Sequence, residues 1–372
     1  MTALRNKEIS LPPSTLKKIA KDPVLSAEVA HLHYVNDAGT GITRKKHGKT
    51  FRYFSKDKKI NDLKTLDRIR KLGIPPAWEN VWICPQENGH LQATGLDVKG
   101  RKQYRYHALW NMLRNETKYF RLHQFGKSLP SIRSQIEKDI SLPGMPRDKI
   151  LALLIKIMER TTIRVGNSSY EKMYGSFGLT TLKNKHVSVE GSSVIFSFRG
   201  KKGIEHAITL KSKRLAKMVK KCLDIPGKEL FQYYDEEGNI HSVDSGSLNA
   251  YIKRISEADF SSKDFRTWEG TLHALTAIKD IHETDNELSV KTASVEIYNR
   301  VARQLGNTRT VCKKYYVHPL IMELYEDGRI TKYIKETFSA EDEEVKDELL
   351  PEEKILLKIL SNESHTPKIT TI

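Results

Sequence analysis

Short segments rich in β-forming residues dominate the first third of the chain. Aromatic and β-branched residues gather over residues 50–54 and 80–83, and Gly, Asn and Pro residues separate these stretches, which predicts β-strands joined by turns. One helix is expected over residues 63–72, where apolar side chains recur at helical spacing until Gly73 and two prolines end it. The first third therefore predicts a small, β-rich domain.

The pattern becomes helical after Tyr106. Residues 148–162 carry apolar side chains on one helical face, and residues 294–305 carry them at every fourth position before Gly306, which is well placed to end that helix. Three alternating stretches with glycine-containing turns between them interrupt the helices and predict a small antiparallel sheet over residues 186–189, 193–198 and 205–210.

These patterns together predict an α+β fold. We expect a β-rich N-terminal domain over residues 1–107 and a mainly α-helical domain, with the small antiparallel sheet, over residues 108–335. Residues 336–372 are expected to form an acidic, loosely attached tail, although residues 355–360 could form one helix.

The charge of the chain indicates its partner. The 372 residues include 63 Lys+Arg and 46 Asp+Glu, a net charge of +17. Ten acidic and four basic residues lie between Glu336 and Ile372, so this segment carries −6 and residues 1–335 carry +23. Nucleic acid is the first candidate, because neutralising phosphates releases counterions. An anionic membrane is the weaker alternative, and a basic protein with a merely solvated surface stays open.

Other classes of function lack their characteristic residues. The three cysteines are scattered and fit a reducing cytosol better than a disulfide framework or a zinc site. The most apolar run, residues 150–158, is far shorter than the roughly 20 residues that span a bilayer, and the N-terminus has no apolar signal core. Residues 41–50 have the wrong glycine spacing for a phosphate-binding loop. We therefore expect no cofactor, no metal and no membrane association.

A set of basic residues in the second domain ends in a tyrosine. Taken in order with two segments of the first domain, it resembles the type IB DNA topoisomerases in the compact form found in poxviruses and bacteria. The likeness extends over residues 30–335. The segments that carry it are Ile74–Trp78, Leu91–Tyr106, Ile163–Tyr170, Thr181–Val187, Phe198–Gly203, Lys263–Trp268 and Leu305–Tyr316.

The resemblance implies a clamp around double-stranded DNA that relaxes supercoils by single-strand cleavage, rotation and religation. In this family a tyrosine attacks a phosphodiester, the 5′-oxygen leaves, and a 3′-phosphotyrosine conserves the bond energy without ATP. By its position in the matching motif, Tyr316 is the nucleophile, and its reference pKa of about 10 calls for a cationic site. We expect a monomer in the cytoplasm, associated with the nucleoid.

The resemblance also assigns the other catalytic residues. Arg164 and Arg266 match the arginines that clamp the phosphate oxygens, for which guanidinium groups have suitable geometry. Lys201, in the predicted hairpin turn, matches the general acid that protonates the leaving 5′-oxygen. Asn307 stands nine residues before Tyr316, where many members have histidine and bacterial members often have asparagine. Its amide can donate to a phosphate oxygen, but the substitution excludes an imidazolium there.

DNA contacts outside the chemistry follow from the same match. Residues 101–106 interleave cations, an amide and aromatic rings, which suits a β-element in the major groove. The resemblance implies contacts through Gln103, Tyr104 and Tyr106, and a further one through Tyr170. The basic run over residues 211–221 either faces phosphate or is a solvated helix face.

Each of these residues alone also has a structural interpretation. Arg164 fits a helix end, Lys201 a solvated turn, and Arg266 an ion pair with an acidic neighbour on its own helix, Asp264 or Glu269. The adjacent Tyr315 and Tyr316 could be core aromatics. Their joint occurrence in the order of the family favours the catalytic interpretation.

Two other functions stay open. A tyrosine recombinase or integrase uses the same chemistry, but it usually has a histidine three residues before its second arginine, where this chain has Lys263. A non-catalytic architectural DNA-binding protein would explain the charge, but it leaves Tyr316 and Arg164 without a purpose.

Overall fold

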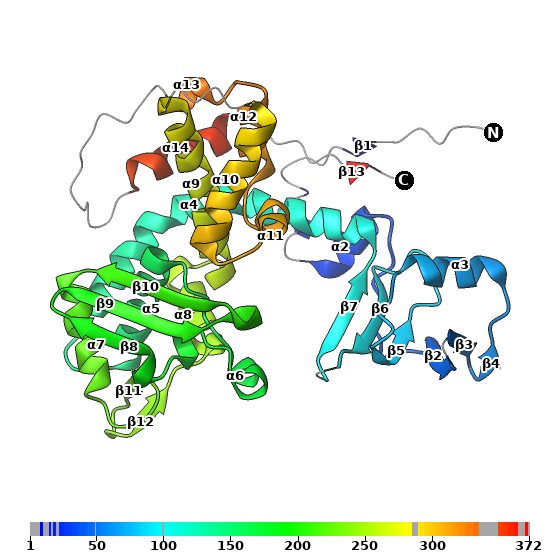
Figure 1. Cartoon of the computed structure of the whole chain (residues 1–372), viewed down its shortest axis with the longest axis horizontal. Coiled ribbons are helices and arrows are strands. Elements are labelled where there is room, and N and C mark those ends of the chain that lie inside the picture. The colour runs from blue at the N-terminus through cyan, green and yellow to red at the C-terminus, as the bar shows by residue number, and fades with distance from the viewer. Residues whose placement is uncertain are drawn as a thin grey trace. The chain divides into compact units, whose positions relative to one another are not determined.

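The computed structural model describes residues 8–9, 15, 18–19, 22–48, 50–98, 100–284, 289–334, 349–363 and 369–370. The chain forms two compact units, unit 1 with Met1–Arg121 and His365–Ile372, and unit 2 with Leu122–Ser364. The long helix α4 (Ala108–Ile140) begins where the sequence predicts a domain boundary, and the division into units falls inside it (Figure 1). Within the described residues, no helix is both long enough and apolar enough to cross a bilayer.

Unit 1 is built on a six-stranded antiparallel sheet. Its strands lie in the order β4-β3-β2-β5-β6-β7, and β7 is an edge strand. Ile42, Val81 and Ile83 of the sheet pack against Ile69 of α3 (Leu63–Lys71), so the helix and strands predicted for this region are confirmed. The strands are β2 (Ile42–His47), β3 (Thr50–Ser55), β4 (Lys58–Lys59), β5 (Glu79–Ile83), β6 (Leu91–Leu96) and β7 (Lys102–Tyr106).

Two smaller elements complete unit 1. Helix α2 (Pro23–Val29) and the residue after it contribute Ala27 and Ala30 to a separate apolar cluster, which Trp110 and Leu113 of α4 complete. Strand β1 (Glu8–Ile9) pairs antiparallel with β13 (Ile369–Thr370).

Unit 2 is a helical assembly around one large apolar core. Helix α5 (Arg147–Thr161) is buried over most of its surface rather than on the single face that the sequence predicts, because it packs against α7, α8, β10 and β11. The other helices are α6 (Ser168–Tyr174), α7 (Lys213–Leu223), α8 (Ser245–Ser256), α9 (Ser262–Glu283), α10 (Val290–Leu305), α11 (Arg309–Tyr315), α12 (Pro319–Glu326), α13 (Thr331–Ile334) and α14 (Pro351–Asn362).

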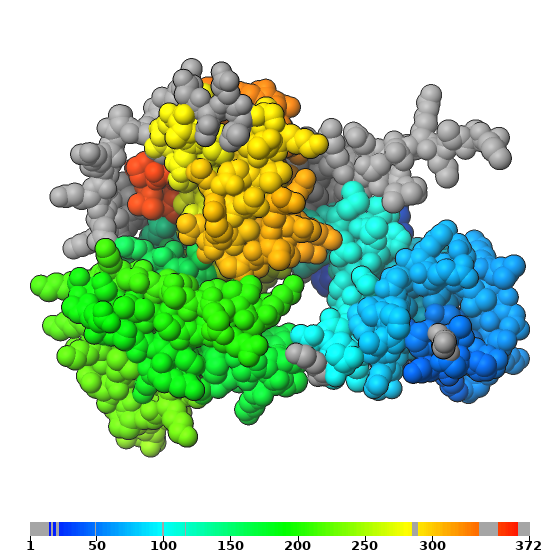
Figure 2. All heavy atoms as spheres, viewed as in Figure 1, coloured from blue at the N-terminus to red at the C-terminus, as the bar shows by residue number. Residues whose placement is uncertain are grey.

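The predicted antiparallel sheet is present in unit 2. It has the order β10-β9-β8, with strands β8 (Val187–Glu190), β9 (Ser193–Arg199) and β10 (Glu205–Lys211). A short hairpin of β11 (Gln232–Tyr234) and β12 (Ile240–Ser242) lies apart from it. Figure 2 shows the sheet surface in green next to the yellow and orange surface of α10 and α11.

The tight β9–β10 turn fixes the position of Lys201. Gly200 N donates to Ile204 O at 2.7 Å, and Gly203 N donates to Gly200 O at 3.1 Å. Lys202 and Gly203 both have positive φ, of 64° and 77°, which the glycine adopts without strain. Lys201 therefore stands at the tip of the hairpin, as the sequence predicts.

The expected loose attachment of the acidic tail is wrong for residues 351–362. Helix α14 places Ile355, Leu356 and Ile359 in the core of unit 2 and packs against α9. Its Glu353 is 0% exposed and accepts hydrogen bonds from Arg133 Nη1 at 2.7 Å, Arg133 Nη2 at 2.8 Å and Trp268 Nε1 at 3.0 Å. The acidic composition of this segment gave no sign that one of its helices packs into the core with a buried, hydrogen-bonded carboxylate. Residues 335–348 lie outside the described part.

Replacement of Glu353 by alanine should destabilise unit 2. The variant removes the Glu353 carboxylate from the buried Arg133 guanidinium, and breaking a buried pair costs about 3–5 kcal/mol. Burial alone would raise the pKa of Glu353, but Arg133 lowers it below the ordinary carboxyl value. This stabilisation is thus complete above the ordinary pKa of a glutamate and is lost as the pH falls through the lowered one.

Urea unfolding of the full chain measures this effect. At pH 7 we expect a large loss of unfolding free energy for Glu353→Ala and a small one for the control Glu352→Ala in the same helical turn. The difference in unfolding free energy between wild type and Glu353→Ala should become smaller at acid pH. Equal unfolding midpoints at pH 7 would contradict the role of this pair.

Candidate active site

The structure brings together the five catalytic candidates of the sequence, all within unit 2. They come from the segment after α5, the β9–β10 turn, α9, and the two ends of α11. Hydrogen bonds, a ring contact and mutual charges link them. The residues are Arg164, Lys201, Arg266, Asn307 and Tyr316.

Arg164 lies in the segment that follows α5, which ends at Thr162 in the left-handed conformation. Its backbone O accepts from Leu179 N at 2.8 Å, and Gly178 allows this approach, since a Cβ there would lie 2.5 Å from Arg164 O. The side chain reaches the end of α10, where Nη2 donates to Gly306 O at 3.0 Å and to Asn307 Oδ1 at 2.5 Å. Arg164 is therefore bound into the site and is not a free helix-end arginine.

Asn307 presents a donor to the site. Gly306 ends α10 in the left-handed conformation, as predicted, and Asn307 N donates to Ala302 O at 2.9 Å. Because the amide oxygen accepts from Arg164, the amide nitrogen Nδ2 points elsewhere, and it is buried with no hydrogen-bond partner in the described part of the chain. A buried donor without an acceptor is costly, so this arrangement fits a site that receives an acceptor from a ligand.

Arg266 provides a second buried donor. It is 5% exposed; its Nη1 donates to Thr162 O and its Nη2 donates to Leu305 O at 2.9 Å. These backbone carbonyls, rather than an acidic neighbour on α9, are its partners among the described residues. Its Nε is buried and has no partner there. The guanidinium carbon lies 5.3 Å from the centre of the Tyr316 ring, within cation–π range.

Tyr316 and Tyr315 occupy different environments. Tyr316 is the residue that ends α11, and Thr271 Oγ1 donates to its backbone O at 3.2 Å. Gly270 lets this backbone approach α9, because a Cβ at Gly270 would lie 2.8 Å from Tyr316 O. Tyr315 is 38% exposed, with Lys314 over its ring. Tyr316 faces the arginines, with the Arg266 guanidinium over its ring.

The cations of the site change its proton affinities. Burial alone would raise the pKa of Tyr316, but Arg266, Arg164 and Lys263 outweigh it and lower that pKa below its ordinary value. Burial and the charge of Arg266 lower the pKa of Arg164 to about 10. Desolvation and the charge of Arg164 also lower the pKa of Lys201. The tyrosine thus loses its proton more readily, and the lysine donates its proton more readily.

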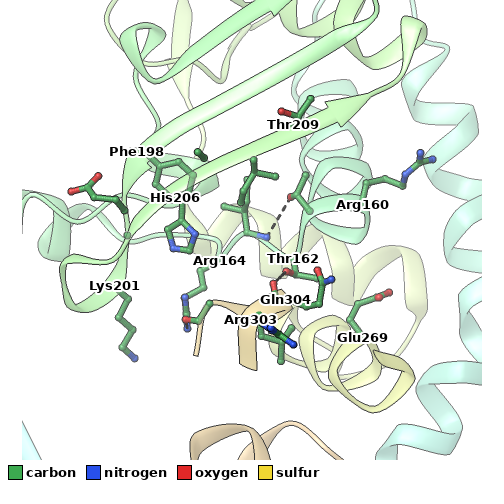
Figure 3. Close-up of a pocket in the computed structure, with 18 of the residues that line it drawn as sticks. Arg160, Thr162, Arg164, Phe198, Lys201, His206, Thr209, Glu269, Arg303 and Gln304 are labelled. Atoms are coloured by element: carbon green, nitrogen blue, oxygen red, sulfur yellow. Dashed lines mark hydrogen bonds between the residues drawn. The ribbon is translucent and has the colours of Figure 1, made fainter. Parts of the chain in front are cut away.

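A pocket of about 440 Å³ opens beside these residues. Figure 3 shows Lys201 and His206 on the hairpin and Arg164 across from them. Sequence reasoning missed His206, Gly270 and the effect of Lys263 on Tyr316. The alternation that predicts β10 gives no sign that His206 lies at a catalytic cluster, and Gly270 looks like any glycine in a helix.

The predicted DNA contacts are on the surface. Gln103, Tyr104 and Tyr106 lie on edge strand β7, where the two tyrosines are 47% and 40% exposed with ring centres 5.9 Å apart. Asp97 orients the Gln103 side chain, since its Oδ2 accepts from Gln103 Nε2 at 3.0 Å. Tyr170 is 49% exposed on α6 of unit 2.

Comparisons with known proteins identify the family of the chain. The family model of the eukaryotic DNA topoisomerase I catalytic core matches residues 102–344, and that of the bacterial DNA topoisomerase IB N-terminal domain matches residues 50–97. The chain is 34% identical over 299 residues to DNA topoisomerase 1B of Acanthamoeba polyphaga mimivirus, covering 77% of this chain and 88% of the viral protein. It is 25% identical over 265 residues to DNA topoisomerase 1B of Vaccinia virus (strain Copenhagen), covering 70% and 80%.

Proposed function

The chain belongs to the type IB DNA topoisomerases, and from this premise we propose that it relaxes supercoiled double-stranded DNA through a 3′-phosphotyrosyl intermediate on Tyr316. One observation carries the proposal. Two buried N–H donors, Arg266 Nε and Asn307 Nδ2, have no acceptor among the described residues and lie in the cluster that surrounds this tyrosine. A phosphodiester supplies the oxygens that such donors lack.

Strand cleavage is a transfer between two oxygens. Tyr316 Oη loses its proton to solvent and attacks phosphorus, so that a phosphorus–tyrosine bond forms and the bond to the 5′-oxygen breaks. Lys201 gives its proton to that leaving oxygen. Arg164, Arg266 and Asn307 stabilise the charge that gathers on the non-bridging oxygens.

Relaxation follows from the reversibility of this step. While the 3′ end is attached to Tyr316, the free 5′ end can rotate around the intact strand. The 5′-hydroxyl then attacks the phosphotyrosine and restores the DNA, returning its proton to Lys201. The free energy of the broken bond is stored in the phosphotyrosine, so no ATP is required.

Duplex binding draws on both units. We assign the exposed tyrosines of β7 and Tyr170 of α6 to contacts with the DNA, and Asp97 to the orientation of Gln103. The net charge of +17 favours binding to a polyanion such as DNA.

Plasmid relaxation without ATP and in excess EDTA should proceed to completion. The mechanism uses only side chains of this protein, and the phosphotyrosine conserves the bond energy. Gel electrophoresis of a negatively supercoiled plasmid measures the result, and a salt series is the internal check, since binding through phosphates weakens steeply with salt. An obligatory need for ATP or for a divalent metal would contradict the mechanism. Recombined plasmids would indicate a recombinase, and binding without relaxation an architectural protein.

A further inference from the structure

His206 lies where the two catalytic turns of unit 2 meet. It is on β10, directly across from Phe198 of β9, and its strand leads out of the turn that carries Lys201. It lines the same pocket as Arg164 and Lys201. In Figure 3 its ring lies between the hairpin and Arg164.

The ring of His206 contacts the backbones of two glycines. A Cβ at Gly200 would lie 2.6 Å from ring atoms Cδ2 and Nε2, and a Cβ at Gly306 would lie 2.7 Å from Cε1. Gly200 precedes Lys201, whereas Gly306 precedes Asn307 and accepts from Arg164 through its carbonyl. A single side chain therefore touches both the turn with the general acid and the turn that helps bind the phosphate.

The ring is held by packing and not by polar contacts. Its centre lies 5.0 Å from that of Phe198, with 21° between the ring planes. Among the described residues, its nitrogens have no hydrogen-bond partner. Burial, Arg164 and Arg266 lower the pKa of His206, and the opposing effect of Glu205 is smaller, so the ring is uncharged at neutral pH. An uncharged ring can lie beside these cations without repulsion.

We propose that His206 is a positioning residue for strand cleavage, whose ring holds the Lys201 turn against the Gly306–Asn307 turn. The contact sets the place of Lys201 relative to the phosphate that Arg164 and Asn307 bind, so that the lysine reaches the leaving 5′-oxygen. The inference rests on the proposed function, and it makes His206 act through Lys201 alone. If the ring served only to fold the hairpin, the effect of removing it would not depend on the proton that Lys201 donates.

Single-turnover cleavage of two oligonucleotide duplexes tests the inference. One has the ordinary 5′-bridging oxygen, and the other has a 5′-bridging sulfur, which leaves without a proton. We expect His206→Ala to slow cleavage of the ordinary duplex by about 10²-fold, the effect of a small misplacement of a catalytic group, and to cleave the sulfur duplex at close to the wild-type rate. His206→Ala combined with Lys201→Ala should be no slower than Lys201→Ala alone.

Two further variants sharpen the test. Gly200→Ala keeps His206 but adds a Cβ that displaces its ring. Gly200 has an extended backbone that any residue adopts, so the substitution itself causes no backbone strain. We therefore expect slow cleavage of the ordinary duplex and nearly wild-type cleavage of the sulfur duplex. The control is His241→Ala, because His241 also stacks on the facing residue of a hairpin, Tyr233, with ring centres 5.5 Å apart, in the separate β11–β12 hairpin. It should cleave like wild type.

The outcomes separate the inference from its premise. If His206→Ala folds and cleaves the ordinary duplex like wild type, or is equally slow on both duplexes, the positioning role is refuted. If His206→Ala does not fold, Gly200→Ala decides by the same criteria. A wild-type protein that cleaves neither duplex would overturn the proposed function itself, whereas a Lys201→Ala defect that sulfur restores would uphold it independently of His206.

Discussion

Tyr316→Phe is expected to abolish both relaxation and the covalent protein–DNA adduct while DNA binding persists. The substitution removes one oxygen and keeps the ring that lies 5.3 Å from the Arg266 guanidinium. The backbone contact with Thr271 is also retained. The fold and the phosphate site should therefore survive, and only the nucleophile is lost. Relaxation gels and a denaturing gel of trapped complexes measure the two activities, and an electrophoretic mobility shift measures binding.

Tyr315→Phe is the matched control for this prediction. Tyr315 is the neighbouring residue, is 38% exposed and has the Lys314 ammonium over its ring. It should keep most of its relaxation activity. Loss of activity in Tyr315→Phe together with its retention in Tyr316→Phe would reverse the assignment.

Lys201→Ala should slow cleavage by about 10²–10⁴-fold, the range for loss of a positioned general acid. The charge of Arg164 and desolvation lower the pKa of this lysine, which favours proton release in the transition state. A 5′-bridging sulfur should restore most of the rate, because a thiolate leaves without protonation. Single-turnover cleavage of both substrates measures the effect.

Lys202→Ala is the control for the lysine. Lys202 is the next residue of the same turn, and it is not among the residues that line the pocket with Lys201 and Arg164. Its removal should change the rate only slightly. An equal defect of Lys201→Ala on both substrates would assign Lys201 to DNA binding instead of acid catalysis.

The sequence predicts the elements of this fold better than their packing. Strands β3 and β5 of unit 1, the three strands of the unit 2 sheet and the end of α10 at Gly306 follow from local pattern and turn chemistry, which act within a few residues. Helix α14 was expected to be loosely attached because its segment is acidic. Its attachment depends on Arg133 and Trp268, which lie far away in the chain.

The same limit applies to the site. The order of the motifs identifies Arg164 and Asn307, but only the structure shows the hydrogen bond between them that leaves Asn307 Nδ2 without a partner. The role inferred for His206 depends on its contacts with the backbones of Gly200 and Gly306. One glycine precedes His206 closely in the chain, and the other follows it at a long distance. No spacing in the sequence encodes such a contact.

Identification of the residue that becomes attached to DNA is the most direct test of the account. The wild-type protein would be trapped with denaturant on a duplex labelled on the strand that keeps the 3′-phosphate, digested with a protease and a nuclease, and mapped by mass spectrometry. We predict a single nucleotide phosphate ester on Tyr316. The same modification on Tyr315, or the absence of any adduct during active relaxation, would contradict the account.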